Sequence, residues 1–248
     1  MPFVTSRDGT RIGYTTIGTG PALILVDGAM CWRASGPATP LAEQLNDRFT
    51  VYTYDRRGRG ESGDTKPYAT AREVEDLDAV IAAAGGLALV YAISSGAALA
   101  LEAAGNGSAI SKMVLYEAPF ITERSRPLID AGYVARMAEF VARGDNAGAI
   151  KLFMREGVQI PAFGVFMMRL MGMMKKMAPV APTLPYDTAL TAPFQAGEPL
   201  PANRWSKATM PVLCIGGGKS DAWMQNAQKA IAAVLPHAQH RTLDGQNH

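Results

Sequence analysis

The sequence predicts an α/β protein: a doubly wound, mostly parallel sheet with a helical insertion that caps it. Three observations favour this fold class. Short uncharged runs such as residues 22–26 alternate with helical patterns across short loops, which is typical of a parallel sheet covered by helices on both faces. The alternation stops at residue 118, where helical and proline-rich sequence begins. It resumes near residue 210.

The first part of the chain is predicted to hold a hairpin, two buried strands and two helices. Asp8-Gly9 is a strong turn dipeptide. The uncharged run 22–26 is typical of a strand buried on both faces. The pattern Thr70-Ala71-Arg72-Glu73 predicts a capping box at a helix start. The expected elements are a hairpin over 3–18, strands at 22–26 and 49–55, and helices at 37–45 and 70–84.

The second part of the predicted sheet is interrupted by a long insertion. Strand patterns flank it on both sides and helical periodicity fills it, with methionines concentrated between residues 162 and 178. We expect residues 1–117 and 208–248 to form the core, and residues 118–207 to form a helical cap rather than an independent domain. The expected strands lie at 89–93, 112–116, 210–215 and 240–243. The expected helices lie at 97–104, 133–143, 147–155, 165–177 and 222–234.

Composition restricts the partners and the compartment. The 248 residues are 48% hydrophobic and 19% charged, with a net charge of +2 and no basic run, so nucleic-acid binding has no support. No uncharged stretch reaches the length of a membrane helix, and the N-terminus lacks a signal-peptide pattern. Cys31 and Cys214 suggest no disulfide framework. We expect a cytoplasmic protein with a small-molecule substrate and no membrane partner; the oligomeric state is left open.

A turn around Ser94 is the first candidate for catalysis. The sequence Ala92-Ile93-Ser94-Ser95-Gly96 matches the pattern G-x-S-x-G with alanine at the first position, between a predicted strand and a predicted helix. Such a turn exposes the hydroxyl beside the free N–H groups of the helix start, as an acyl-transfer nucleophile requires. The alternative is a structural turn in which the serines cap the helix.

The general base has few candidates, because all three histidines lie in the last twelve residues. His237 follows Pro236 at a helix end. His240 begins a strand at the opposite edge of the sheet from Ser94. His248 follows the last strand and lies at the same edge as Ser94, so we take it as the base.

Three further motifs accompany the serine turn. Residues 8–14 form the first hairpin, residues 55–63 read Asp-Arg-Arg-Gly-Arg-Gly-Glu-Ser-Gly, and residues 245–248 read Gly-Gln-Asn-His. In this order they resemble an α/β-hydrolase of the single-domain esterase, lactonase and perhydrolase type. The resemblance covers the chain outside the cap and implies the α/β-hydrolase fold, with no metal or organic cofactor. In that family the chain continues beyond the histidine into a helix that covers the sheet.

The resemblance also implies an oxyanion hole. The backbone N–H groups of Ala29 and Ser95 would form it. The family often has His-Gly after its third strand, where this sequence has Asp27-Gly28. Asp27 would adjust the local field or bind a substrate group; alternatively, it is a turn former that bonds its own loop.

Two carboxylates compete for the third place of a catalytic triad. The usual acid follows the seventh strand, where Asp221 lies, although Asp221 could instead cap the next helix. Some relatives, including certain dehalogenases, carry the acid after the sixth strand, which corresponds to Glu117. A carboxylate at the end of a buried strand needs a partner, and a histidine N–H would supply one. We favour Glu117 over Asp221.

The leading hypothesis is a serine hydrolase that acts on a small apolar ester, lactone or related acyl compound. The serine nucleophile disfavours dehalogenase and epoxide hydrolase chemistry. The alternatives are a ligand-binding or sensor protein on the same fold, or a perhydrolase, C–C hydrolase or lyase. The pocket is expected to be shaped by Asp27, Cys31, Trp32, Phe120, Met168 and Met171.

Overall fold

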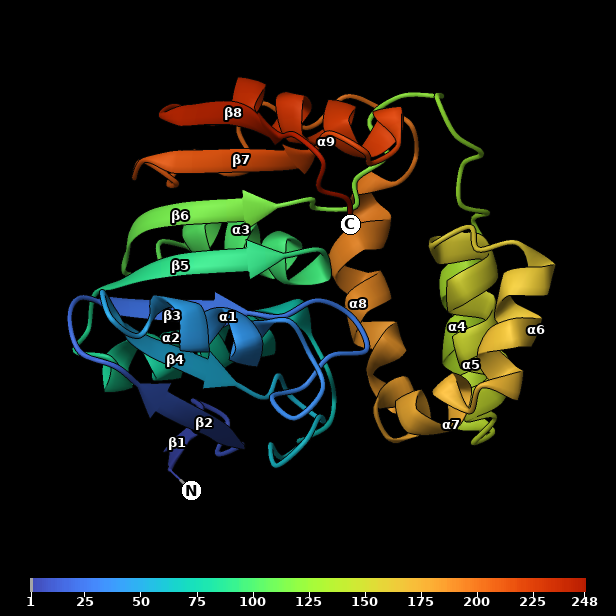
Figure 1. Ribbon diagram of the computed structural model, residues 1–248, viewed down its shortest axis with the longest axis horizontal. Helices are drawn as coiled ribbons and strands as arrows, with labels where there is room; N and C mark the ends of the chain where they lie inside the picture. Colours follow the sequence, from blue (N-terminus) through green and yellow to red (C-terminus); the bar gives the residue numbers. More distant parts are fainter. Residues whose placement is uncertain (1) are drawn as a thin grey trace.

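The computed structural model describes residues 2–248, and these contain a single eight-stranded sheet (Figure 1). The strand order is β1-β2-β4-β3-β5-β6-β7-β8. Strands β3 to β8 pair in parallel, and only β1 and β2 run antiparallel to their neighbours. The strands are β1 (Phe3–Thr5), β2 (Arg11–Ile17), β3 (Ala22–Val26), β4 (Thr50–Tyr54), β5 (Ala88–Ile93), β6 (Ile110–Tyr116), β7 (Val212–Gly217) and β8 (Ala238–Leu243). The predicted fold class is confirmed.

Four helices lie on the two faces of this sheet. Helices α2 (Thr70–Ala83), α3 (Ser95–Asn106) and α9 (Ala222–Val234) share one apolar core against one face. Helix α1 (Ala38–Leu45) packs on the opposite face against β3 and β4. Helix α3 is almost entirely buried because its residues are mostly alanine, glycine and leucine, which allow close packing on β5.

The predicted capping box at the start of α2 is wrong. Thr70 is the first residue of the helix rather than its N-cap, and Ala69 holds the N-cap position without a side-chain bond. Glu73 is buried and forms an ion pair with Arg56 at 2.8 Å. A buried guanidinium needs a counter-ion, and this need outweighs a cap worth about 1 kcal/mol.

The chain between β6 and β7 is mainly helical and lies over the carboxyl ends of the strands (Figure 1). Helix α8 crosses the edge of the sheet, and the other helices lie outside it, away from the strands. No helix among residues 2–248 is long and apolar enough to cross a membrane. The elements are α4 (Tyr133–Ala142), α5 (Asn146–Leu152), a π-helical turn (Phe153–Gly157), α6 (Ala162–Leu170), α7 (Met173–Met177), a 3₁₀ segment (Ala178–Thr183), α8 (Leu184–Thr191) and a 3₁₀ turn (Ala192–Phe194).

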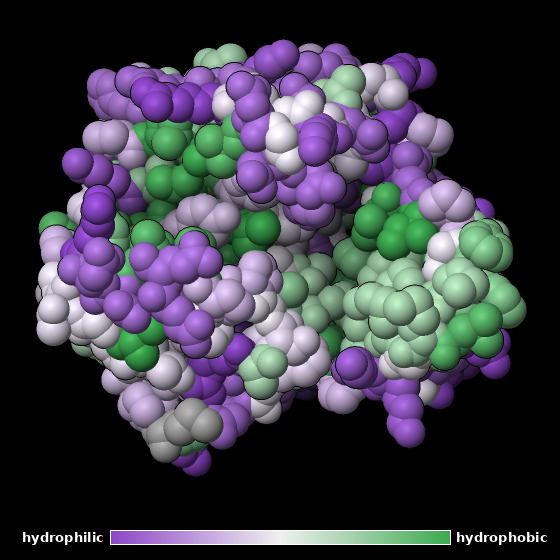
Figure 2. Space-filling model, viewed as in Figure 1, coloured by the Kyte–Doolittle hydropathy of each residue, from purple (hydrophilic) through white to green (hydrophobic). Residues whose placement is uncertain are grey.

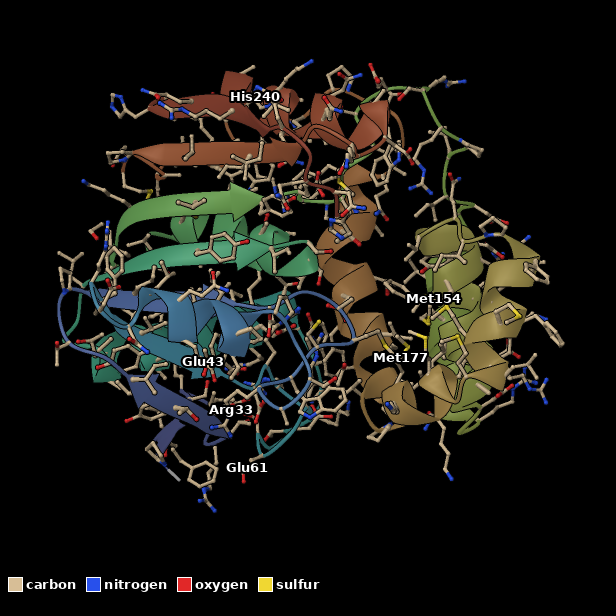
Figure 3. The ribbon with its side chains drawn as sticks, in the orientation of Figure 1. Arg33, Glu43, Glu61, Met154, Met177 and His240 are labelled. Carbon is tan, nitrogen blue, oxygen red and sulfur yellow. The ribbon has the colours of Figure 1, made fainter. Side chains whose placement is uncertain are left out.

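This helical segment has its own apolar core. Figure 3 shows Met154 and Met177 inside it, between α8 and the outer helices. Met30, from the loop after β3, packs into the same cluster and so joins it to the sheet. The single helix predicted over 165–177 is two helices, because Gly172 has a left-handed φ of 71° between α6 and α7. Whether residues 118–207 fold only together with the core stays a prediction.

Candidate active site

Ser94 lies in a sharp turn between β5 and α3. Its φ and ψ are 57° and −129°, a conformation that non-glycine residues seldom adopt. The Ser94 N–H donates to the carbonyl of Tyr116 at 2.9 Å, which ties the turn to β6. A Cβ added to Gly28 would lie 2.8 Å from the Cβ of Ser94, and one added to Gly96 would lie 2.5 Å from the carbonyl oxygen of Val26. The close packing around Ser94 therefore requires glycine at position 28, in the adjacent loop, and at position 96, in the first turn of α3.

Glu117 and His248 are in direct contact at the same edge of the sheet. The Nδ1 atom of His248 lies 2.9 Å from Oε2 of Glu117. The other carboxylate oxygen of Glu117 accepts the Gly217 N–H at 2.7 Å. Glu117 also has a left-handed φ of 51°, and its own N–H donates to the Ile215 carbonyl at 3.1 Å. This residue is therefore held by β7 on both its backbone and its side chain.

These contacts determine the ionisation of the carboxyl group. Burial by itself would raise the pKa of Glu117, but the hydrogen bonds from His248 and Gly217 outweigh it and lower the pKa below its ordinary value. The histidine loop is fixed as well, because the Tyr116 hydroxyl donates to the Asn247 carbonyl at 2.8 Å. The carboxylate is thus ionised at neutral pH and positioned to accept a hydrogen bond from the Nδ1–H group of His248.

Within residues 2–248, no hydrogen bond joins the Ser94 hydroxyl to the ring of His248. Such bonds are commonly long in free hydrolases and tighten when substrate binds. The imidazole side chain of His248 is 38% exposed. Figure 3 shows His240 on β8, where it pairs with Cys214 within the strand and does not follow the strand end.

Within residues 2–248, Asp221 forms no hydrogen bond or ion pair with His248. It occupies the N-cap position of α9 but makes no side-chain capping bond. Its carboxylate accepts a long hydrogen bond of 3.4 Å from the Trp223 indole. Of the two acids considered from the sequence, the structure therefore brings only Glu117 to the imidazole.

A buried arginine connects the serine turn to the cap. Arg56 donates to the Ser95 hydroxyl at 3.1 Å, to the Asp187 carboxylate at 2.9 Å and to the Asp27 carbonyl at 3.3 Å. The Ser95 hydroxyl in turn donates to Asp187 at 2.7 Å. Asp187 belongs to α8, so the residue after the nucleophile is bonded to a cap helix. We call Arg56, Arg59 and Asp187 the clamp.

Arg59 completes the clamp from the other side. It donates to Asp187 at 2.7 Å and to the carbonyls of Gly28 and Cys31 at 2.6 and 3.2 Å. Burial would raise the pKa of Asp187, but the charges of Arg59 and Arg56 outweigh it and hold the pKa below its ordinary value. The same two guanidinium groups thus fix the loop that carries Ala29 and the helix that covers it.

A small cavity of about 50 Å³ adjoins Ser94. Both residues expected to form the oxyanion hole, Ala29 and Ser95, line it. One part of its wall is apolar, and α8 with the following turn supplies a polar part. The lining residues are Ala29, Ser94, Ser95, Pro119, Ile129, Tyr133, Phe153, Gly157, Val158, Asp187, Thr188, Thr191 and Gln195.

The residues predicted to shape the pocket lie elsewhere. Phe120 is fully buried in the sheet core against Phe194, because the chain turns inward after β6. Met171 is 69% exposed beyond the end of α6. Met168 packs against the apolar core of the cap. These three predictions are corrected by the structure.

The predicted pocket residues that precede α1 are also outside this cavity. Trp32 borders a separate hollow with Arg33. Cys31 contributes a carbonyl to Arg59 rather than a side chain to the cavity. The Asp27 carboxylate packs against Gly36, where an added Cβ would lie 2.4 Å from its Oδ2 atom. Asp27 is therefore buried below the loop, which is nearer to the structural alternative than to a substrate contact.

Sequence reasoning missed the clamp and the polar wall of the cavity. Arg56 and Arg59 belong to the loop 55–63, which follows a predicted buried strand. Three arginines in such a loop were the sequence feature that could have indicated buried ion pairs. Asp187 is the one acid between residues 157 and 197, within apolar and proline-rich sequence. An isolated acid there needs a buried cation, and three arginines after a buried strand need buried acids.

The fold and the strand-to-helix serine turn are those of the α/β hydrolases. A model of the alpha/beta hydrolase family matches residues 18–248, and the chain belongs to that family. The solved structure of an alpha/beta hydrolase from Sphaerobacter thermophilus DSM 20745 is 42% identical, with a TM-score of 0.91, covering 100% of this chain and 94% of that one. Family membership supports hydrolase activity.

More distant structures share the fold alone. An esterase from Thermogutta terrifontis is 20% identical with a TM-score of 0.67, covering 100% of this chain and 90% of that one. The enol-lactonase from Burkholderia xenovorans LB400 is 18% identical with a TM-score of 0.66, covering 98% and 91%. The same architecture therefore carries several hydrolytic activities, and the substrate has to be argued from the site.

Removal of the clamp carboxylate should destabilise the protein strongly. Asp187→Ala leaves Arg56 and Arg59 buried without their shared counter-ion, and we expect a loss of about 3–5 kcal/mol of unfolding free energy. Urea denaturation followed by circular dichroism measures this loss. Asp130→Ala, which removes an exposed ion pair with Arg136, is the matched control and should have little effect. Equal stability of the two variants would contradict the clamp.

Asp27 should make the stability fall with rising pH. Burial raises its pKa from 3.8 to about 6, so between these values the folded state binds a proton that the unfolded state has lost. The stabilising effect is complete below pH 3.8 and is lost as the pH rises through about 6. Asp27→Asn cannot ionise and should be more stable than the parent at pH 8 by about 3 kcal/mol, but not at pH 4. Urea titrations at both pH values test this, with the exposed Asp47→Asn as control.

Proposed function

We propose that this protein is a serine hydrolase that cleaves a small ester, lactone or related acyl compound through an acyl-enzyme intermediate. The observation that carries the proposal is the Glu117–His248 contact of 2.9 Å at the same sheet edge as Ser94. A carboxylate that orients an imidazole beside a serine in a sharp turn is the constellation of nucleophilic acyl transfer.

The contacts around His248 define its part in the proposed reaction. Glu117 accepts a hydrogen bond from the Nδ1–H group of His248, which leaves the unprotonated Nε2 free to act as the base. The Ser94 Oγ attacks the carbonyl carbon while His248 takes the hydroxyl proton. The N–H groups of Ala29 and Ser95 stabilise the oxyanion of the tetrahedral intermediate. This intermediate collapses when the C–O bond to the leaving group breaks, and His248 returns the proton to that group.

Water completes the proposed cycle. His248 removes a proton from a water molecule that attacks the acyl carbon, and Ser94 leaves with that proton. Glu117 remains ionised throughout and stabilises the imidazolium formed in each half-reaction. Its lowered pKa supports this role, because a protonated carboxyl group could not stabilise the cation.

The cavity beside Ser94 favours a short acyl group. Its volume of about 50 Å³ accommodates only a few non-hydrogen atoms. Ile129, Phe153 and Val158 form the apolar wall, and they close the space on the side of the cap. An acyl chain of several carbons would have to displace these side chains, so acetyl and propionyl esters are the first substrates to test.

Loss of the nucleophile or of the base should abolish turnover. Ser94→Ala and His248→Ala are each expected to lower kcat on p-nitrophenyl acetate by on the order of 10³-fold or more, because the two residues act as a unit. Kinetics on esters of increasing acyl length and on lactones measures the effect and the preference together. Both variants should keep the parent circular dichroism spectrum.

A fluorophosphonate probe separates a hydrolase from a ligand-binding protein on the same fold. The parent protein should be labelled and Ser94→Ala should not. A folded parent protein that remains unlabelled, or a Ser94→Ala variant with parent activity, would overturn the proposal.

Replacement of Glu117 should affect rate more than affinity. Glu117→Gln keeps the shape of the side chain but removes the charge that stabilises the imidazolium, so kcat should fall by on the order of 10²–10⁴-fold while KM changes little. Asp221→Asn is the matched control at the alternative acid position, and it should keep the parent rate. Steady-state kinetics of both variants decides the assignment: a severe defect in Asp221→Asn with near-normal Glu117→Gln would reverse it.

A further inference from the structure

The outer face of the cap presents apolar side chains to the solvent. Phe163, Phe166, Met167 and Leu170 occupy positions i, i+3, i+4 and i+7 of α6, which is one face of a helix. All four are exposed, Phe163 by 73% and Leu170 by 65%, whereas Val165 is the one buried residue of α6. Figure 2 shows the surface over this part of the molecule as mainly hydrophobic. We call this surface the α6 face.

A groove adjoins the α6 face. It lies between α5, α6 and α7 and has a volume of about 650 Å³, far larger than the cavity at Ser94, with which it shares no lining residue. Val165 and Phe166 contribute to its apolar wall. Four cationic side chains also border it, and no acidic residue does: these are Lys151, Arg155, Arg169 and Lys175.

The charge of this region differs from that of the whole chain. Residues 146–186 contain five cationic residues and one carboxylate, a net charge of +4, whereas the whole chain carries +2. The one carboxylate, Glu156, already pairs with Arg136. Within residues 2–248, the four cations of the groove form no ion pair, and Arg155 donates only to a backbone carbonyl. The positive charge beside the α6 face is therefore uncompensated by the protein.

We propose that the α6 face docks on an anionic lipid bilayer. Exposed aromatic and aliphatic side chains on one side of a short helix, flanked by lysine and arginine, are the features of a helix that lies in the plane of a membrane interface. The side chains of Phe163, Phe166 and Leu170 enter the boundary between headgroups and acyl chains. The cations contact the lipid phosphates. Since no described helix can cross a bilayer, the association is peripheral.

Charge complementarity selects this occupant over a second copy of the chain. In a twofold symmetric dimer the same patch would face itself, and Arg169 and Lys175 would be brought near their own counterparts. Like charges at a contact disfavour such an interface. An anionic surface instead compensates all the cations at once and covers the exposed apolar residues. Composition alone predicted no membrane partner. The net charge of +2 hides the cationic region because it averages over a cationic cap and an otherwise acidic chain.

Flotation with lipid vesicles tests the docking directly and does not depend on the proposed function. The full protein should float with vesicles of phosphatidylcholine that contain phosphatidylglycerol and stay unbound with phosphatidylcholine alone. High salt should release it, because screening weakens attraction between surface charges. Lys176 is the exposed neighbour of Lys175 in α7. Lys175→Glu with Lys176→Glu should weaken binding by at least roughly 30-fold, because each lysine near an anionic surface contributes about fivefold.

Apolar substitutions test insertion separately from charge. Phe163→Gln with Leu170→Gln should reduce flotation with anionic vesicles, and glutamine keeps the helical propensity of α6. Leu87→Gln and Arg7→Glu are matched controls for an exposed apolar and an exposed cationic residue away from the cap, and they should bind like the parent. Circular dichroism confirms that each variant is folded.

Several results would overturn the proposal. One is no flotation with anionic vesicles, and another is flotation unchanged by both cap variants. A dimer in light scattering that Phe163→Gln dissociates, without vesicle binding, would make the α6 face an interface between copies. Binding of a monomeric alkyl phosphate in the groove without vesicle binding would make it a site for single amphiphiles.

Discussion

The buried ion pairs of the clamp are the interaction on which the arrangement of sheet and cap depends. Arg56 and Arg59 follow β4, and Asp187 comes from α8, more than a hundred residues later. A buried guanidinium without a counter-ion is costly, so these ion pairs favour the docking of α8 on the loop. The same guanidinium groups bind the carbonyls of Asp27 and Gly28. The position of the cap and the shape of the proposed oxyanion hole are therefore set by one network.

The strain at the site is balanced by the neighbouring strands. Ser94 and Glu117 both have positive φ angles, each costing on the order of 1–3 kcal/mol. Each N–H nevertheless donates to the next strand of the sheet, Ser94 to Tyr116 and Glu117 to Ile215. The hydrogen-bond ladder thus continues one residue beyond the regular strands. The strained backbone of Ser94 and Glu117 persists because these hydrogen bonds hold each residue to the neighbouring parallel strand.

Local pattern and parallel topology account for what could be predicted. Periodicity located every strand of the sheet to within a few residues, and parallel pairing brought the strand ends bearing Ser94 and Glu117 to one edge. The contacts that decide the cavity are not local. Glu73 forms a buried ion pair with Arg56 instead of the predicted capping box. Phe120 packs in the core of the sheet and does not line the pocket. Asp187 could not be paired with its arginines from sequence, since no spacing rule links residues so far apart.

The cap also shows that sequence patterns do not predict how an element is oriented in the fold. The apolar spacing of α6 identifies a helix and its apolar face, but periodicity gives no direction for that face relative to the core. In this structure α8 and its following turn, which lie against the sheet, contribute Thr188, Thr191 and Gln195 to the cavity beside Ser94. The outer helix α6 carries its apolar residues toward the solvent. The cap thus lines the cavity beside Ser94 with both apolar and polar residues, and it leaves apolar residues of α6 exposed on its outer side. An exposed apolar face of this kind is typical of an interaction surface, which is the basis of the proposed docking of α6.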